Sequence, residues 1–453
     1  MAIVTASSVL EATLEKVNPE LPALLATVPT VANMIKSSGR AEKITNKLFR
    51  IPRLMYNGGN FGKYDADGGD MGAGTGMKVG KLTGGYFDSR YMVEISKKAM
   101  DVTDSPEQAI VNAFSHQLKN AIKEVAVMDD ITIHTSGDAV LTSSVGASAT
   151  STWASGAKTT YTFASATDYI GVDRLRPGMM VGVYGTGGTP LRTDLAGTTN
   201  SWPIDHIDWT NKVVYIDGLV NSAASTDILA FNGMAATLTT GADWPTTLTA
   251  DTFRHGLPYF VNSSTSGYTL GTLRANDTEL LANYVNASSA ALTFQHIQAA
   301  VDQALKRRDM DTMSGVVGLF HQAQRAQIFN IGISVAAKLI GGDSFGKSVD
   351  LMPSNAGMDE FNVCGIPCKV DRLQDKSRVD FIVPKTWGRA MLHETKFHQP
   401  PQGGGKYIFE SRATTGNLKA AWLFAIVQAF DYFCTDPGAN SYVGSVAVPS
   451  LYA

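Results

Sequence analysis

Residues 341–348, GGDSFGKS, match the phosphate-binding loop pattern G-x-x-x-x-G-K-S at every position. Such a loop binds phosphates through backbone N–H groups and a helix N-terminus, so it needs a strand before it and a sustained helix after it. Pro353 follows Ser348 closely and leaves no room for a useful helix. The best magnesium-binding carboxylate, Asp217, lies far upstream. A glycine-rich surface loop is therefore favoured over a nucleotide-hydrolysing site.

His393 and His398 come close to the zinc-helix pattern H-E-x-x-H, but one extra residue separates them. At about 100° per helical residue, this spacing places the two side chains about 140° apart. The three cysteines, Cys364, Cys368 and Cys434, show neither a disulfide framework nor zinc-finger spacing, and we predict buried thiols. The aspartates of residues 65–70 are favoured as solvated loop charges. We therefore predict a non-enzymatic protein with no catalytic, cofactor or metal site.

The composition suits a structural protein that buries much of its surface against copies of itself. Only 17% of the 453 residues are charged and the net charge is −3, whereas a dedicated nucleic-acid binder usually has a basic face. No basic region of a signal peptide is visible, and no run reaches the ~18 apolar residues of a membrane span. The closest run, residues 420–433, contains Gln428 and Asp431 and predicts a buried strand or another core element.

Residues 58–85 contain 11 glycines in 28 positions. Ordering glycines costs much backbone entropy, and the few apolar side chains of this stretch cannot offset that cost. The flanking residues 47–56 and 86–96 are rich in aromatic and branched side chains and predict strands. We expect a long hairpin with a glycine-rich tip that needs a neighbouring molecule to become ordered.

A long amphipathic helix is predicted over residues 101–134. Ser105 and Gln108 form a capping box around Pro106, which suits the first helical position. Apolar residues recur at helical spacing on one face, at Ile110, Phe114, Leu118, Ile122 and Val125. A helix with a single apolar stripe needs another element along it.

The remaining segments differ in character. Residues 1–46 form an arm too interrupted by prolines to build a core. Residues 137–255 contain no glutamate and predict a small all-β domain with strands at 158–163, 179–184, 204–208 and 212–217. Residues 257–400 predict mixed helices and strands, with a helix capped by Thr293. Long apolar strands close the chain over residues 406–433.

This order of parts resembles the tailed-phage major capsid proteins of the Hong Kong 97 fold. The resemblance covers nearly the whole chain. It is carried by the phrases SPEQAIVNAFSHQLKNAIKEVAVMDD, LRPGMMVGVY with NKVVYIDG, LPYFVN, LKRRDMD with VVGLFHQAQR, and TTGNLKAAWLFAIVQAFDYF.

The resemblance implies an α+β fold with six parts. These are an N-terminal arm (1–46), an extended β-hairpin loop (47–100), the spine helix of a peripheral domain (101–136), an inserted β-barrel-like domain (137–256), a mostly axial domain (257–400), and peripheral strands with the C-terminus (401–453). The inserted domain would decorate or brace the outer surface.

It also implies a subunit that assembles into an icosahedral shell. Copies of the chain would form hexamers and pentamers, with separate scaffolding, portal and decoration proteins, around double-stranded DNA that is not bound specifically. Assembly would occur in the cytoplasm of a host bacterium, without a membrane, and the mature location would be the virion. The residues expected at contacts between subunits are Gly68, Gly69, Met71, Gly74, Gly76, Met77, Arg90, Arg307 and Arg308.

Two other classes stay open from the sequence. One is an encapsulin-like compartment shell, which shares the fold. The other is a phosphate-loop enzyme that uses Lys347.

We expect the purified chain to turn over no ATP, because the motif at 341–348 lacks a following helix. The measurement compares phosphate release by the parent chain and by a Lys347→Ala variant. Turnover that this substitution abolishes, in a chain that stays monomeric, would support the enzyme instead.

Overall fold

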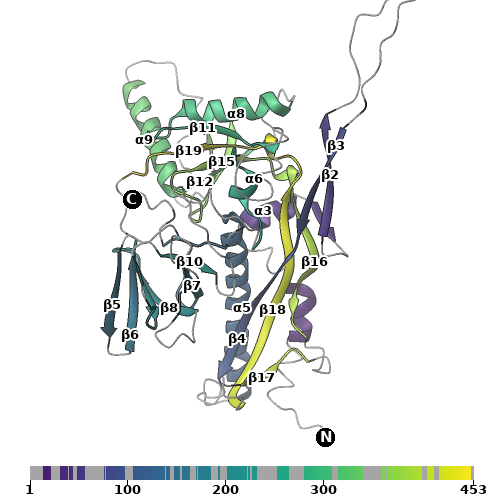
Figure 1. The fold of residues 1–453 in the computed structure, drawn as a ribbon, viewed down its shortest axis with the longest axis vertical. Helices are drawn as coiled ribbons and strands as arrows, with labels where there is room; N and C mark the ends of the chain where they lie inside the picture. The colour runs from purple at the N-terminus through teal and green to yellow at the C-terminus, as the bar shows by residue number, and fades with distance from the viewer. Residues whose placement is uncertain are drawn as a thin grey trace, which may run out of the picture.

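In the computed structural model, the 453-residue chain folds into a mixture of helices and strands (Figure 1). It describes residues 14–21, 31–38, 40–43, 48–56, 76, 78–96, 106–137, 139–142, 147–153, 156–163, 170, 172–184, 192–193, 201–221, 223–224, 227–231, 253–264, 280–308, 315–339, 360–363, 365–399, 406–412 and 418–449.

The long axis of the molecule is formed by helix α5 (Pro106–Ile133) and a five-stranded sheet, here called the spine sheet (Figure 1). Its central strand is β18 (Leu418–Cys434), which pairs antiparallel with β4 (Phe87–Ser96), β16 (Trp387–Phe397) and β17 (Phe409–Arg412). The short β1 (Arg40–Lys43) adds to β16 in parallel. The apolar run at 420–433 is thus part of a strand, as predicted, and residues 424–426 and 428–433 are buried.

The predicted long helix is confirmed by α5, whose 28 residues span about 42 Å at 1.5 Å per residue. Ser105 lies outside the described residues, so the capping box stays a prediction. The apolar face of α5 packs on the spine sheet, because Leu118, Ile122 and Val125 share a buried cluster with Phe424 and Ile426. The element that the single stripe required is therefore the spine sheet.

The hairpin differs from its prediction. Strand β2 (Leu48–Tyr56) pairs with β3 (Lys78–Gly85), so the partner strand lies inside the glycine-rich stretch. The predicted partner, residues 86–96, is instead β4 of the spine sheet. The expected pairing was wrong because sheet hydrogen bonds are made by the backbone, so a glycine-rich segment can still pair. The remaining glycine-rich residues, apart from Gly76, lie outside the described part of the chain.

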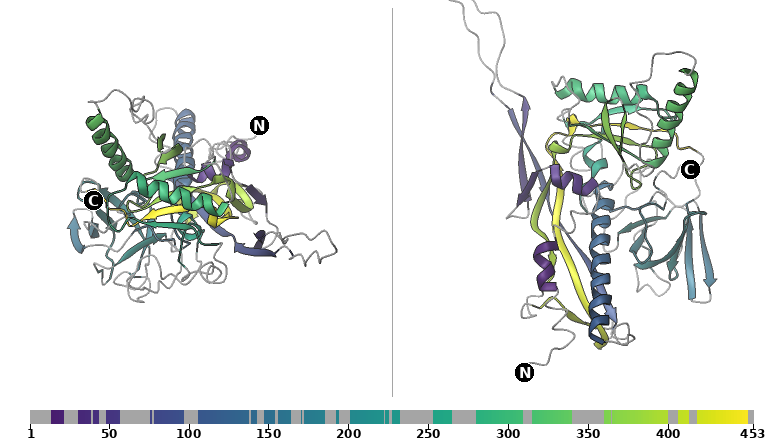
Figure 2. Two further views of the ribbon diagram at one scale, coloured as in Figure 1. Left: turned by 90° about the horizontal axis from the view of Figure 1, so that it is seen from above. Right: turned by 180° about the vertical axis from the view of Figure 1, so that it is seen from behind.

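A second, upper body is built on a mixed six-stranded sheet (Figure 2). In spatial order its strands are β11 (Asn283–Asn286), β19 (Ser441–Gly444), β15 (Val379–Ile382), β12 (Val317–Phe320), β14 (Ile366–Val370) and β13 (Glu360–Val363). Helices α8 (Phe294–Arg308) and α9 (Gln322–Leu339) accompany it. The predicted cap of α8 is present, since the N–H of His296 donates to Oγ1 of Thr293 at 3.3 Å.

A third body is an antiparallel six-stranded sheet with its own apolar core. Its strands in spatial order are β10 (Ile228–Phe231), β7 (Met180–Tyr184), β8 (Trp202–Asp208), β9 (Val213–Asp217), β6 (Gly156–Thr162) and β5 (Ala147–Trp153). All four strands predicted in this region are confirmed. This β body and the β2–β3 hairpin project from opposite sides of the spine (Figures 1 and 2).

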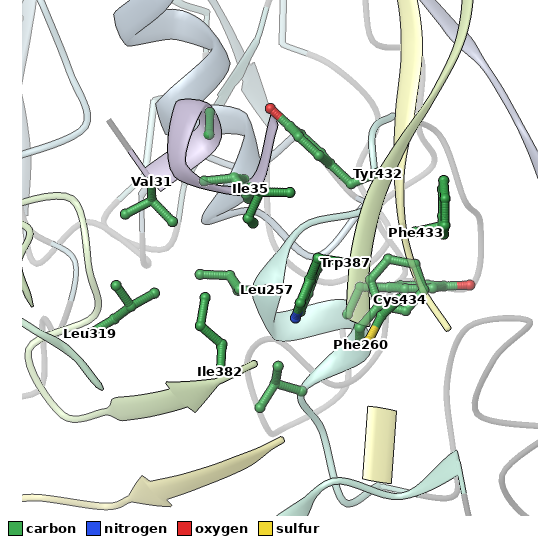
Figure 3. Close-up of a cluster of buried hydrophobic side chains, with 14 of the residues drawn as sticks. Val31, Ile35, Leu257, Phe260, Leu319, Ile382, Trp387, Tyr432, Phe433 and Cys434 are labelled. Atoms are coloured by element: carbon green, nitrogen blue, oxygen red, sulfur yellow. The ribbon is translucent and has the colours of Figure 1, made fainter. Parts of the chain in front are cut away.

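Short elements fill the junction between the spine and the upper body. They are α3 (Val31–Ser38), α6 (Leu257–Phe260), η3 (Pro384–Thr386) and η4 (Pro437–Ala439). The short η1 (Asn18–Glu20) lies further along the spine sheet, where Oδ1 of Asn18 accepts a hydrogen bond from the N–H of Phe397 at 2.8 Å. Val31 and Ile35 of the N-terminal arm pack with Phe260, Trp387 and Phe433 in a shared apolar cluster (Figure 3). The described part of the arm thus packs on other elements, as predicted.

The chain enters and leaves the β body at one point, here called the neck. Ser136 and His255 form an antiparallel bridge, and the N–H of Gly256 donates to the carbonyl of Thr135 at 3.1 Å. A side chain at Gly256 would overlap the carbonyl oxygens of Ile133 and Thr135. Gly137 has φ +86°, a left-handed conformation that favours glycine.

We expect Gly256→Ala to lower the free energy of unfolding by at least about 3 kcal/mol, because the added methyl group meets backbone atoms that cannot move without opening the neck. Urea denaturation followed by circular dichroism measures this. Gly76→Ala is the matched control, since no atom of the described residues lies within 4 Å of its added methyl group. Equal stability of the two variants would contradict the tight neck.

Candidate functional site

The spine sheet leaves one of its faces open along β4. Strand alternation directs Tyr91 and Val93 toward the cluster on α5, so Arg90, Met92 and Glu94 point the other way. Arg90 and Glu94 are exposed, and the Met92 side chain is 46% exposed.

On the neighbouring strand β18, half-buried Val427 and Leu423 stand opposite Arg90 and Glu94 in the strand register. These five residues, Arg90, Met92, Glu94, Leu423 and Val427, are called the outer face. It combines an apolar centre with one positive and one negative charge, a pattern suited to a specific protein contact.

The β2–β3 hairpin is a separate two-stranded sheet in the described structure. It extends away from the spine sheet beside the upper body (Figure 1). An isolated two-stranded hairpin is at best marginally stable in water, so packing against another surface is expected to stabilise it.

A network of buried charges, here called the joint, fixes the neck to the spine. Nη1 of Arg254 donates to Oδ1 of Asp129 at 2.8 Å, and Nη2 donates to Oγ of Ser89. The Arg254 guanidinium lies over the ring of Phe430, with Cζ 3.6 Å from the centroid, and that of Arg389 lies over the same ring at 3.4 Å. The joint therefore connects α5, β4, β16, β18 and the neck.

The neighbouring residue of the neck completes this network. The backbone N–H of His255 donates to Oδ1 of Asp431 at 2.8 Å, and its Nδ1 lies 2.5 Å from Oδ2. Burial raises the pKa of Asp431, while the His255 imidazole acts in the opposite direction. Buried charges are costly unless they are paired and hydrogen-bonded, so these contacts fix the position of the neck on β18.

No catalytic arrangement forms around the sequence motifs in the part of the chain that the structure describes. Residues 341–348 lie outside it, and the element before them is helix α9 where a phosphate loop needs a strand. His393 lies on strand β16, where its Nδ1 is 3.1 Å from the Glu394 carbonyl oxygen. Cys368 and Cys434 are buried free thiols, and burial raises the pKa of Cys434 to about 12.

The residues expected at subunit contacts fall into three groups. Gly68, Gly69, Met71, Gly74 and Met77 lie outside the described residues. Gly76 is exposed, and Arg90 belongs to the outer face. Arg307 and Arg308 end helix α8, far along the chain from the hairpin. Their roles at contacts stay predictions.

The joint was missed by sequence reasoning, although one signal for it was visible. Gln428 and Asp431 interrupt the apolar run of β18, and both serve the joint: Gln428 donates to Asp129, and Asp431 binds His255. Asp129 and Arg254 carry no such signal, because their pairing spans 125 positions of the chain.

Comparison with known proteins gives matches among solved structures alone. No protein-family model and no curated protein matches the chain. The cyanophage A-1(L) capsid is 10% identical with a TM-score of 0.45, covering 93% of this chain and 94% of that one. The capsid of the native GTA particle is 7% identical with a TM-score of 0.42, covering 92% of this chain and 91% of that one. The mature capsid of bacteriophage PhiM1 is 9% identical with a TM-score of 0.41, covering 93% of this chain and 89% of that one.

These three structures are capsids, the class of protein that the sequence resembles. At such identities and TM-scores the likeness does not assign the chain to a family. Among the described helices, none combines the length and apolarity needed to cross a lipid bilayer.

We expect Arg254→Met to lower the free energy of unfolding by about 3–5 kcal/mol, because it removes the guanidinium that is hydrogen-bonded to the buried Asp129 carboxylate. Adding Asp129→Asn should restore at least about 1 kcal/mol, since the amide carries no charge. Urea denaturation measures both.

The matched control is Lys158→Met, which breaks a pair whose Asp205 side chain is 36% exposed and should cost at most about 1 kcal/mol. If the loss in free energy of unfolding of the Arg254→Met, Asp129→Asn double variant equalled the sum of the losses of the two single variants, Arg254 would act by packing alone.

Proposed function

We propose that this chain is a major capsid protein, a structural subunit that assembles with copies of itself into a closed icosahedral shell. The observation that carries the proposal is the β2–β3 hairpin, a two-stranded sheet that is hydrogen-bonded to none of the other sheets of the described structure. Such a sheet gains stability from a partner surface, and a second copy of the chain supplies one.

The outer face supports the same proposal. An apolar side chain as exposed as Met92, flanked by Arg90 and Glu94, suits a surface that becomes covered on association. A shell needs several contacts per subunit, and each is expected to bury roughly 1,000–2,000 Å². The hairpin, the outer face and the end of α8 at Arg307 and Arg308 supply separate contact regions.

The finer assignment follows the Hong Kong 97 type of subunit. The hairpin serves as the extended loop over a neighbour, α5 as the spine helix, and the upper body as the axial domain around five-fold and six-fold axes. The inserted β body decorates or braces the outer surface. The shell encloses phage double-stranded DNA, with scaffolding, portal and decoration proteins as partners, and is assembled in the cytoplasm of the host bacterium.

The modest net charge of −3 accords with DNA that is enclosed without specific binding. A compartment shell with a protein cargo would have the same subunit contacts. The contents of purified particles distinguish the two, because a phage capsid contains double-stranded DNA and a compartment contains its cargo enzyme.

We expect a chain in which residues 48–85 are replaced by a four-residue glycine-serine linker to fold but not to form shells. Leu48 and Gly85 are register partners, so a short linker can join the flanking residues without strain. Negative-stain electron microscopy, with and without a candidate scaffolding protein, measures assembly, and the thermal midpoint measures folding. Shells of the parent diameter from the shortened chain would refute the role of the hairpin.

A point variant tests the outer face independently. Met92→Glu should abolish shells in a folded chain, because a carboxylate would be buried in the contact. Met180→Glu is the matched control, since Met180 is a strand methionine of the β body that is 42% exposed. Its shells should form normally. A parent chain that forms no particles under any of these conditions would overturn the proposed function.

A further inference from the structure

Three side chains with metal-ligating atoms meet where α5 ends. Asp130 lies in the last turn of α5, His134 follows the helix four positions later, and Asp371 follows β14. Nε2 of His134 is 2.9 Å from Oδ2 of Asp371, and the ligand atoms of all three residues lie within 4.8 Å of one another. The exposed fractions are 1% for the His134 side chain and 11% for that of Asp371, and Asp130 is 6% exposed.

The spacing of these atoms fits a single ion. Two ligand atoms at about 2.0–2.1 Å from a tetrahedral metal ion are about 3.3–3.4 Å apart. Nε2 of His134 and Oδ2 of Asp371 are 2.9 Å apart as a hydrogen-bonded pair, so a small movement apart would let both bind one ion. The third carboxylate, Asp130, is near enough to join them with a small movement of its side chain.

Both carboxylates are also held in place by the backbone. The N–H of Ala32 donates to Oδ1 of Asp130 at 3.1 Å, and the N–H of Leu373 donates to Oδ1 of Asp371 at 2.8 Å. Bonds of this kind orient metal ligands in known sites. They fix the two carboxylates, which lie at the end of α5 and in the loop after β14.

Two buried carboxylates face one imidazole, and two carboxylates that share a buried site repel each other. Arg174, which donates Nε to the Leu373 carbonyl at 3.1 Å, also acts electrostatically on Asp371, and Lys376 lies 3.5 Å from Asp173. A cation bound between Asp130 and Asp371 would balance both carboxylates directly.

We propose that Asp130, His134 and Asp371 bind one divalent transition-metal ion, Zn²⁺ or Mn²⁺. One imidazole nitrogen and two carboxylates form a donor set that suits both ions. The ion ties the end of α5 to the loop after β14 and, through Asp130, to the start of α3.

This site is independent of assembly, and its test uses the unassembled full-length chain. The chain is stripped with a chelator, incubated with Zn²⁺ or Mn²⁺ alone and desalted, and its metal content and thermal midpoint are measured. One ion per chain and a midpoint raised by several degrees are expected. Asp371→Asn and His134→Gln should each weaken uptake at least about tenfold. Retention of parent uptake by both variants would overturn the site.

The matched control is His206→Gln. His206 belongs to another histidine–aspartate pair, with Nδ1 2.6 Å from Oδ2 of Asp205, but it is on the exposed face of the β body. Its uptake should equal that of the parent, and loss of uptake in this variant would place the ion there and overturn the proposal.

A second measurement needs no variant and so does not depend on how the variants fold. Pulsed electron paramagnetic resonance of the Mn²⁺-loaded parent should detect one coordinated imidazole nitrogen. Uptake of less than about a tenth of an ion per parent chain would refute the metal site, and so would a spectrum without nitrogen coupling. Asp130, His134 and Asp371 would then be a buried polar cluster without an ion.

Discussion

Strand β18 is the constraint on which the other parts of the subunit depend. Its 17 residues pair with β4 through residues 421–430 and with β16 through residues 426–434. Because both partners bond residues 426–430, they must lie on opposite edges of β18. The strand is therefore enclosed by hydrogen bonds on two sides while α5 covers one of its faces. A strand held in this way has one register, and every element that joins it takes its position from it.

The same strand determines where the inserted β body is attached. Phe430 lies under the guanidinium groups of Arg254 and Arg389, and Asp431 binds both the backbone and the ring of His255. Apolar packing alone would tolerate a shift of the neck along the strand. When the partner of a buried charge moves away, the cost in free energy is much larger than for an apolar contact. The joint therefore specifies one position for the neck. The cost of desolvation thus contributes positional accuracy.

The functional proposal depends on what this rigid frame leaves uncovered. Among the described residues, the spine sheet joins five strands and the upper sheet six, whereas β2 and β3 pair only with each other and the outer face exposes Met92. A subunit whose central sheets each join several strands and whose hairpin and outer face are uncovered can be stabilised by neighbouring copies without changing its fold. The proposed metal ion would act within the frame, at the end of α5, and not at these edges.

The sequence by itself determined the elements whose signals are local. The apolar stripe of α5, the apolar run of β18, the four strands of the β body and the Thr293 cap of α8 each depend on residues a few positions apart, and all are found where they were predicted. Local spacing carries this information because helix and strand periods repeat within a few residues.

Only the tertiary structure decided which strands pair and which charges meet. The partner of β2 was misassigned because glycine weakens the strand signal of residues 78–85 without preventing their backbone bonds. Arg254 pairs with Asp129, 125 positions away in the chain, and His134 pairs with Asp371, 237 positions away. Those pairings exist because β18 and α5 bring distant segments into one buried volume of low dielectric constant, where a charge must be paired, and no pattern of neighbouring residues records which partner will be there.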